Sequence, residues 1–547
     1  MTLPASITTN LFSDFKNSSM GPFPAIFQVV QDTDNSVSQA IGSTNPQKVA
    51  QSFQVSTAGD LTSIEIYAKK LNSPTDSILI TLCADNAGEP GTVLGTGTPI
   101  PVATFVGTAF KYARSVFFVP PALATSTTYW IVAERSGSLD ATNNFQWNNA
   151  TGNPYANGKL RTYNGSAWSD VSSGNGDGRF KVNVRTSGRY QPAVDKTNNK
   201  IRMYKSTDNG NTWSEQDSAN APSISTTSNL KSVSAVPIDN LIQLFHSTAT
   251  GFSRPQFNTT TDTWGSATTV TSTLSTNVSG AAPILGGQRT GFSSSLIVAY
   301  NGATETVMGS ARRRVKVKRF ITAWNSDPGY DIIGSPNTPD TTLPGTAVDY
   351  DVRAVIMDGN GVFHVFWTQS DDSNVHHRQY NTDDTFSTAN LLGSTPATTS
   401  NSAAYSIGGP ANYYRSDEWY MAIPITTSGA IVVSKVKASL SATASNWTNT
   451  TVIASGAEST NSNPAVLIAD NEQGGRLFLI FTKTDGKMYI THDSGSDTWV
   501  AEQEIHPGTK TVAGLSAGML VDVLGTAYLD TSPTPDELRY DETTVFF

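Results

Sequence analysis

Three arginines in this chain could bind a carboxylate, because a planar guanidinium group can donate two parallel hydrogen bonds to one carboxylate. Arg189, Arg353 and Arg415 lie far apart in the sequence. They can form one site only if the fold brings their strands together around a common axis. Solvated surface arginines are the commoner alternative. We therefore treat the three as candidate ligand-binding residues, and the sequence indicates no catalytic residue.

Aromatic residues gather in a Gly- and Asn-rich stretch between residues 145 and 168. The rings of this stretch are Phe145, Trp147, Tyr155, Tyr163 and Trp168, and the candidate ligand-binding residues among them are Trp147, Tyr155 and Trp168. Exposed rings there could stack on sugar rings. The alternative is that these rings pack the loops onto the strands below.

Metal and cofactor motifs are weak in this sequence. His376 and His377 are adjacent on a predicted strand, so they point to opposite faces and cannot share one ion. There is no H-E-x-x-H motif, no P-loop and no G-x-G-x-x-G motif after a strand. Asn- and Asp-rich turns such as 371–374 could hold Ca²⁺ through oxygen ligands, although their spacing is not that of an EF-hand. We expect no metal and no cofactor, with Ca²⁺ left open.

One turn stands out among the elements that would position these residues. Ser206, Asp208, Gly210 and Trp213 occupy fixed positions of the pattern S-x-D-x-G-x-T-W, directly after a predicted strand at 201–205. Asp208 can accept hydrogen bonds from backbone N–H groups a residue or two further on, Gly210 can adopt positive φ, and Trp213 can pin the loop. We expect these four residues to be structural. The turn resembles the Asp-box of sialidases and related β-propellers, where the box joins the third and fourth strands of a blade.

The sequence after residue 186 repeats loosely, in units of about 40–60 residues, which is the period expected of propeller blades. The clearest units cover residues 350–392 and 464–499, and each contains three apolar or alternating runs followed by a polar turn. The first and last units are incomplete, which suggests a ring closed by strands from both ends. We predict a six- or seven-bladed β-propeller over residues 186–547.

Residues 45–185 contain about eight short runs typical of strands, which predicts an antiparallel two-sheet β-sandwich. The order A-Q-S-F, L-T-S-I-x-I-Y-x-K-K, D-N-x-G-x-P-G-T-V-L, T-T-Y-W-I-V and F-K-V resembles a choice-of-anchor jelly-roll module of bacterial surface proteins and phage tail or fibre proteins. The resemblance implies attachment or a carbohydrate-binding type of architecture. Residues 1–44 are polar and irregular, and we expect an N-terminal attachment arm; a flexible leader is the alternative.

The resemblance to sialidases also implies a test for catalysis. Members of that family use three arginines on a substrate carboxylate, a Tyr nucleophile with a Glu base, and an acidic Asp. The family's first arginine lies in an F-R-I-P motif, whereas residues 188–192 read G-R-Y-Q-P, so Arg189 is retained and its apolar neighbours are not. We expect no enzyme activity, and a sialidase-like glycosidase is kept as an alternative.

Composition restricts the classes of function further. Only 15% of the 547 residues are charged, the net charge is −9 and the pI is near 5.2, so general attraction to nucleic acid or anionic membrane is excluded. The single cysteine, Cys83, excludes an intrachain disulfide framework and fits a small buried side chain. Residues 1–10 show no secretory signal pattern, and no apolar run is long enough to span a membrane.

These observations together favour an all-β structural protein of a bacteriophage virion, in the tail, baseplate or fibre. The missing export signal in a turn-rich chain of extracellular type suggests release by lysis, with unconventional secretion as the alternative. We expect the arm and the jelly roll to bind other virion proteins, the propeller to face a partner or a host surface glycan, and the protein to be a homo-oligomer in a symmetric assembly. The alternatives are a sialidase-like glycosidase and a carbohydrate-binding adhesin or lectin of a cell.

Overall fold

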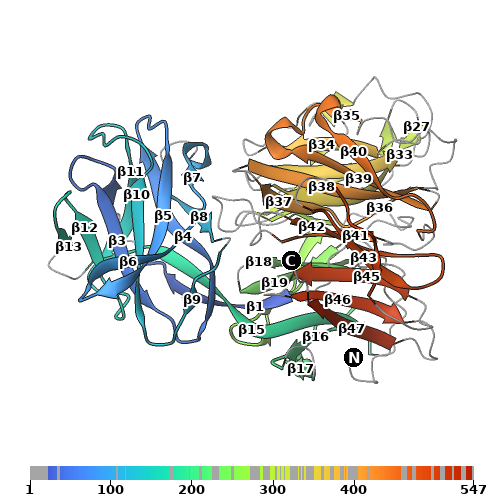
Figure 1. Ribbon diagram of the computed structural model, residues 1–547, viewed down its shortest axis with the longest axis horizontal. Helices are drawn as coiled ribbons and strands as arrows, with labels where there is room; N and C mark the ends of the chain where they lie inside the picture. Colours follow the sequence, from blue (N-terminus) through green and yellow to red (C-terminus); the bar gives the residue numbers. More distant parts are fainter. Residues whose placement is uncertain are drawn as a thin grey trace. The chain divides into compact units, whose positions relative to one another are not determined.

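The computed structural model contains two compact units (Figure 1): one is built mainly from residues 25–186, and the other from residues 23–24 together with the described residues from 187 onward. The structure describes residues 23–33, 37–105, 109–117, 119–171, 176–195, 198–208, 212–224, 233–238, 240–247, 252–271, 284–286, 296–301, 305–307, 310–312, 315–320, 330–331, 334–335, 338–339, 350–358, 362–369, 375–381, 387, 390–391, 405–415, 418–427, 429–457, 465–470, 476–494, 498–505, 512–519, 523–530 and 537–544.

The first unit is a β-sandwich of two antiparallel sheets. The larger sheet contains β1 (Phe23–Gln31), β2 (Val37–Ile41), β4 (Gly59–Leu71), β8 (Lys111–Val116), β9 (Ala122–Leu123), β11 (Asn144–Thr151), β14 (Gly176–Gly178) and the first half of β15 (Phe180–Asp195). The smaller sheet contains β13 (Trp168–Asp170), β12 (Leu160–Tyr163), β3 (Lys48–Gln54), β10 (Thr128–Arg135), β5 (Ser77–Asn86) and β6 (Glu89–Thr96), with β7 (Ile100–Pro101) paired to β5. One short 3₁₀ segment, η2 (Val102–Thr104), follows β7.

Alternating residues of these strands build one core between the two sheets. Ile64 and Ile66 of β4 point into it from the larger sheet, and Tyr129 and Ile131 of β10 point into it from the smaller one. This is the period-two pattern expected of half-buried strands. The sandwich predicted over residues 45–185 is present, and its resemblance to a jelly-roll anchor module stays a prediction.

The boundary predicted for the N-terminal arm, residue 44, needs correction. Strand β1 pairs with β15, and β2 pairs with β11 in a register that places Ile41 opposite Phe145. The described residues between 25 and 44 therefore belong to the sandwich unit. They need no core of their own, because Val29 and Ile41 are buried in the sandwich core and their strands pair with strands far away in the sequence. The first 22 residues lie outside the described residues, so an attachment arm there stays a prediction.

The second unit is a β-propeller whose described residues form seven successive antiparallel sheets. The first contains the second half of β15, β16 (Lys200–Ser206) and β17 (Ser214–Gln216). The second contains β18 (Val233–Ile238), β19 (Leu241–Ser247), β20 (Phe252–Arg254), β21 (Gln256–Asn258), β22 (Thr263–Trp264) and β23 (Thr268–Thr271). The third contains β24 (Ile284–Gly286), β25 (Leu296–Asn301), β28 (Val315–Phe320) and β29 (Tyr330–Asp331).

Among the later sheets, the fourth and the sixth have the four strands expected of a propeller blade, the fifth has five and the seventh has three. The fourth sheet contains β32 (Tyr350–Met357), β33 (Phe363–Gln369), β34 (Val375–Tyr380) and β35 (Asn390–Leu391). The fifth sheet contains β36 (Tyr405–Ile407), β37 (Ala411–Arg415), β38 (Glu418–Thr427), β39 (Ala430–Lys437) and β40 (Thr448–Ile453). The sixth contains β41 (Ala465–Asp470), β42 (Arg476–Thr482), β43 (Met488–His492) and β44 (Gln503–Glu504), and the seventh β45 (Val512–Met519), β46 (Val523–Asp530) and β47 (Glu537–Thr544).

Smaller elements complete this unit. Two-stranded ribbons pair β26 (Glu305–Val307) with β27 (Ser310–Arg312) and β30 (Gly334–Ser335) with β31 (Thr338–Pro339). Its described 3₁₀ segments are η4 (Ser218–Asn220), η7 (Ala438–Leu440) and η8 (Ala444–Asn446). No helix in the described part of the chain is long and apolar enough to cross a membrane.

The fifth sheet shows why the second unit is a propeller. On one face, Met421 and Ile423 of β38 share a core with Phe366 of the fourth sheet. On the other face, Ala422 of β38 shares a core with Leu479 of the sixth sheet. Neighbouring residues of one strand thus pack against the preceding and the following sheet, as expected for blades that stand face to face. The propeller predicted from the sequence repeats is confirmed.

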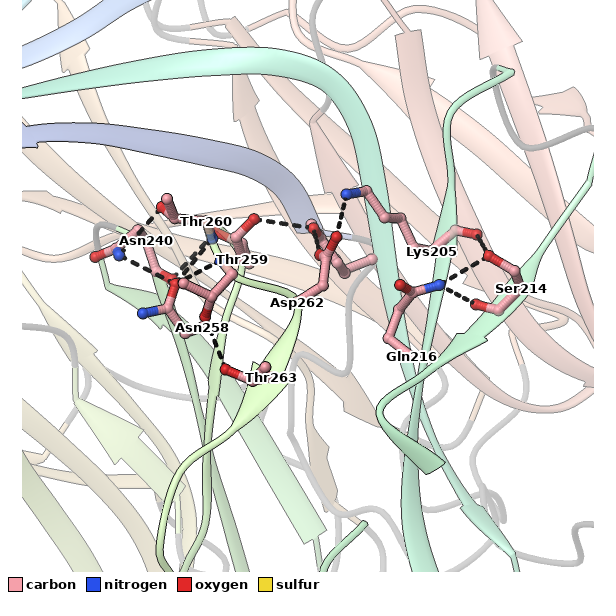
Figure 2. A network of polar contacts seen from close by, with 11 residues as sticks. Lys205, Ser214, Gln216, Asn240, Asn258, Thr259, Thr260, Asp262 and Thr263 are labelled. Carbon is pink, nitrogen blue, oxygen red and sulfur yellow. Dashed lines mark hydrogen bonds and ion pairs between the residues drawn. The ribbon is translucent and has the colours of Figure 1, made fainter. Parts of the chain in front are cut away.

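Polar contacts join the first two propeller sheets (Figure 2). The Lys205 Nζ of β16 lies 2.6 Å from the Asp262 carboxylate. The hydroxyl of Tyr190, on β15, contacts the same carboxylate, and the Trp264 backbone N–H donates to Asp217 at 2.8 Å. Asp262, in the turn before β22, and Trp264 of β22 therefore connect the second sheet to the first.

Candidate ligand-binding surface

The outward face of the smaller sandwich sheet carries a second, small apolar cluster. Since Tyr129 and Ile131 point into the main core, Trp130 and Val132 point to the opposite face of β10, where they pack with Ala50 and Cys83. These four residues are buried, and the half-buried Trp168 of β13 packs against them. Trp168 thus has a packed side toward this cluster while part of its surface stays accessible.

Two rings and a charged pair lie side by side on this face. Tyr163 and Trp168 are directly opposite each other on β12 and β13, with ring centroids 5.1 Å apart. Arg161 and Asp170 form the next pair on the same face, and the Arg161 Nε lies 2.5 Å from the Asp170 carboxylate. Two residues of an antiparallel strand span about 7 Å, so the charged pair lies within reach of a molecule that rests on the rings.

The turn between β5 and β6 folds toward the same residues. In a flat sheet β12 and β6, separated by β3, β10 and β5, would be about 19 Å apart. Nevertheless, Arg161 Nη1 lies 2.7 Å from the Glu89 carboxylate. The side chain of Lys159 also lies near this turn, since a Cβ on Gly88 would be 3.5 Å from its Nζ. The turn therefore bends over the sheet and brings Glu89 to the charged pair.

We call this set the Trp168 surface: Trp168, Tyr163, Arg161, Asp170, Lys159 and Glu89. Its two carboxylates are 35% and 45% exposed, so they can still accept hydrogen bonds from a ligand. Arg161 and Lys159 supply hydrogen-bond donors beside these carboxylates. The Lys159 Nζ lies 3.8 Å from the Asp170 carboxylate. The surface can thus offer apolar ring area and both kinds of hydrogen-bonding group, which suits a polyhydroxylated ligand.

Trp147 does not reach a ligand, and its prediction as a stacking residue is wrong. The side chain is fully buried in the sandwich core, and its Nε1 donates to the Arg179 carbonyl at 2.8 Å. A Cβ on Gly178 would lie 2.9 Å from the indole, so the absence of a side chain at residue 178 leaves room for the ring. Trp147 therefore has a packing role.

Tyr155 is also engaged within the sandwich. Its ring meets Phe180 edge to face, with centroids 5.4 Å apart. Its hydroxyl donates to the Gln54 carbonyl at 3.0 Å and accepts from the Gln54 N–H at 3.1 Å, and burial raises the pKa of Tyr155. These contacts favour loop packing for this residue, so that of the three predicted aromatic candidates Trp168 alone lies at the outward surface described above.

The three candidate arginines have separate surroundings. Arg189 is buried on β15, opposite Ser206, and its Nη1 donates to the Ser187 carbonyl at 3.3 Å. Arg415 of the fifth sheet forms an ion pair with Asp493 at 2.7 Å. Arg353 lies at a bulge in β32, and its side chain is outside the described residues. Arg189 and Arg415 thus form contacts within the propeller, and their guanidinium groups are not presented at an open surface for a ligand carboxylate.

The predicted turn at residues 206–213 joins β16 to β17. Asp208 accepts from the Ser206 hydroxyl at 2.8 Å, from the Thr212 N–H at 2.8 Å and from the Thr212 hydroxyl at 2.6 Å. The Thr212 N–H, four residues further on, is thus a described backbone donor, and the residues one or two further on lie outside the described residues. Trp213 is half-buried, and Gly210 lies outside the described residues. These contacts suit a structural role for the turn; its membership of the Asp-box family stays a prediction.

The sequence analysis named Tyr163 only as one ring of the aromatic stretch, and it did not single out Arg161, Asp170, Lys159 and Glu89 as site residues. The sequence does contain a signal for four residues of this surface. Arg161-x-Tyr163 precedes the turn at 164–167 and Trp168-x-Asp170 follows it, so a hairpin would place both rings and both charged side chains on one face. The contact with Glu89 depends on the bend of a distant turn and has no local signal.

Neither the family models nor the curated proteins compared with this chain give a match. Among solved structures, the Aleuria aurantia lectin, described as a six-bladed β-propeller with a fucose recognition mode, is 13% identical; the match covers 59% of this chain and 93% of that one, with a TM-score of 0.36. The BP39L lectin from Burkholderia pseudomallei is 13% identical; the match covers 66% of this chain and 95% of that one, with a TM-score of 0.40. AofleA from Arthrobotrys oligospora is 10% identical; the match covers 58% of this chain and 86% of that one, with a TM-score of 0.35. These similarities are low, so the function has to be argued from the residues of this chain.

Proposed function

We propose that this protein is a carbohydrate-binding attachment protein and that its sandwich binds a glycan at the Trp168 surface. The observation that carries the proposal is the pairing of Tyr163 with Trp168 directly beside the pairing of Arg161 with Asp170. A sugar ring has an apolar face and a polar edge. The apolar face fits on aromatic rings, and the hydroxyl groups at the edge need donors and acceptors close by.

The charges of the surface favour a neutral glycan. Arg161 and Lys159 are balanced by Asp170 and Glu89, and the ion pairs among them hold all four side chains in place. A fixed set of donors and acceptors loses less conformational entropy on binding than mobile side chains would lose. Hydroxyl groups can replace or join these contacts without adding a net charge.

The wider setting of this activity is part of the proposal. An attachment protein of a phage tail, baseplate or fibre needs a unit for the particle and a unit for a partner or host glycan, and the resemblance of the sandwich to choice-of-anchor modules supports this setting. Location in the virion stays a prediction. Finding the protein in purified particles at a fixed copy number would support it.

The glycan proposal is tested with the full-length protein on an array of neutral and acidic glycans, followed by calorimetric titration with the best ligand. We expect Trp168→Ala to weaken binding at least tenfold, about 1.4 kcal/mol, because the stacking surface is lost. Tyr489→Ala, which removes a half-buried ring from the propeller strand β43, is the matched control and should bind like the wild type.

Two results would contradict the proposal. One is unchanged affinity of a folded Trp168→Ala variant, with folding checked by thermal unfolding. The other is that the wild-type protein binds no glycan. Release of sugar from sialosides by the wild type would instead support the sialidase-like alternative.

A further inference from the structure

The larger sandwich sheet has an outward face that combines rings and cations. Ile64, Ile66 and Ala68 of β4 point into the core, so Tyr67 and Lys69 point away from it. Tyr112 of β8 lies opposite Tyr67, and the Tyr67 N–H donates to the Arg179 carbonyl at 3.0 Å. Lys181 of β15 lies opposite Glu65 of β4. These strands therefore bring side chains from three parts of the sequence onto one surface.

Each of three cations on this surface lies over an aromatic ring. The Lys69 Nζ is 4.4 Å from the centre of the Phe110 ring, and the Lys181 Nζ is 4.3 Å from that of Tyr112. The Arg179 guanidinium is 3.9 Å from the centre of the Tyr67 ring. Such contacts hold the cations in place, because the ring face is electron-rich. We call the three cations and their three rings the cation–ring face.

The carboxylates near this face are paired with two arginines, Arg114 and Arg179, of which Arg179 belongs to the face. Glu65 accepts from Arg114 through the Nε at 2.7 Å. Asp32 is paired with Arg179 and accepts from the Tyr112 hydroxyl. Among the residues that the structure describes, no carboxylate forms an ion pair with Lys69 or Lys181. Two ordered positive charges thus remain uncompensated by a direct contact, in a chain whose net charge is −9.

The two lysines are spread out along the sheet. Lys181 lies opposite Glu65, and Glu65 is four residues from Lys69 on β4, which corresponds to about 13 Å along the strand. Arg179 lies between them, beside Tyr67. A small anion cannot bridge such a distance, whereas an extended chain with repeated negative charges can contact both lysines.

We propose that the cation–ring face binds an acidic polysaccharide, with carboxylate or sulfate groups of successive sugars bound by Lys69 and Lys181. The faces of the three rings are occupied by the protein's own cations, so they are poorly placed for stacking on nucleobases, which single-stranded nucleic acids require. This surface and the Trp168 surface are on different sheets, and the proposal does not depend on glycan binding at Trp168.

The test uses the full-length protein and immobilised polyuronate and sulfated polysaccharide, with dextran as a neutral probe, over a series of salt concentrations. We expect binding to the acidic polymers that weakens as salt rises, and no binding to dextran through this face. Lys69→Met combined with Lys181→Met keeps the apolar stems over the rings and removes both charges, so affinity should fall at least tenfold. Lys69→Arg with Lys181→Arg should retain binding.

Two controls make the outcome decisive. Lys437→Met removes a propeller lysine that is 41% exposed and should leave binding unchanged. Thermal unfolding should be alike for all variants. Wild-type affinity in the double Met variant, failure of the wild type to bind any acidic polysaccharide, or equal affinity for single-stranded DNA of the same charge would overturn the proposal.

Discussion

Asp208 shows how one carboxylate can organise a turn without a ligand. It accepts hydrogen bonds from Ser206 and from both the N–H and the hydroxyl of Thr212. Hydrogen bonds to the ionised form favour that form, and they lower the pKa of Asp208 to about 2, with the Thr212 hydroxyl as the largest cause. The ionised carboxylate is therefore part of the folded turn.

The pH dependence of stability follows from this lowered pKa. Since the pKa in the folded state lies below the ordinary value of 3.8, the carboxylate stabilises the fold above about pH 4, and the contribution is lost as the pH falls toward 2. Asp208→Asn should therefore lower stability at neutral pH and reduce its loss between pH 4 and 2. Urea unfolding at a series of pH values measures this.

Glu418→Gln is a suitable control, because Glu418 is 45% exposed and pairs with an exposed lysine. If Asp208→Asn shows the same stability and pH profile as the wild type and this control, the turn does not depend on the ionised carboxylate.

At the scale of elements, the two adjacent histidines of β34 have different environments. His377 is fully buried, and its Nε2 lies 3.0 Å from the Nδ1 of His364 on β33, whose other ring nitrogen lies 3.3 Å from Asp358. His376 is half-buried and stacks on Trp367, with centroids 5.5 Å apart. Because successive side chains of a strand point to opposite faces, His376 and His377 lie on different sides of β34, as the sequence indicated.

This difference predicts unequal costs for the same substitution. His377→Ala should destabilise the propeller by about 2–4 kcal/mol, because it removes a buried ring and leaves the buried His364 without this contact. His376→Ala should cost less than about 1 kcal/mol, as expected for a partly exposed site. Chemical denaturation of both variants measures this, and equal costs would contradict the assignment of the two faces.

Elements with clear apolar or alternating runs could be predicted from the sequence, and elements rich in polar residues could not. Strand β42 shows the first case: it lies in the unit predicted over residues 464–499, and its residues 477–482 are buried. Strand β11 shows the second: Asn144, Asn148 and Asn149 are buried in it, so the sequence around Trp147 was interpreted as loop. That misinterpretation is why Trp147 became a candidate for ligand binding, while the strand pair carrying Tyr163 and Trp168 was not recognised as a hairpin.

At the scale of the whole molecule, the two units have separate hydrophobic cores. The sandwich core draws its buried residues from positions 29–184, and the described cores around the last propeller sheets draw theirs from positions 354–488. The chain passes from one unit to the other within β15, which pairs with β4 over residues 180–185 and with β16 over residues 189–195. Domain borders cannot be derived from strand patterns when one strand serves two units.

Separate cores predict two thermal transitions for the full-length chain, because each core can be lost without removing the contacts of the other. Trp147→Ala, in the sandwich core, should cost about 3–5 kcal/mol and lower one transition, and Leu479→Ala, in a propeller core, should cost about 2–5 kcal/mol and lower the other. In the double variant the two shifts should add, since the sites share no partners. Differential scanning calorimetry measures all four proteins. A single transition lowered by both substitutions would mean that the sandwich and the propeller unfold as one cooperative unit, and the division of the chain at residue 186 would then have no thermodynamic meaning.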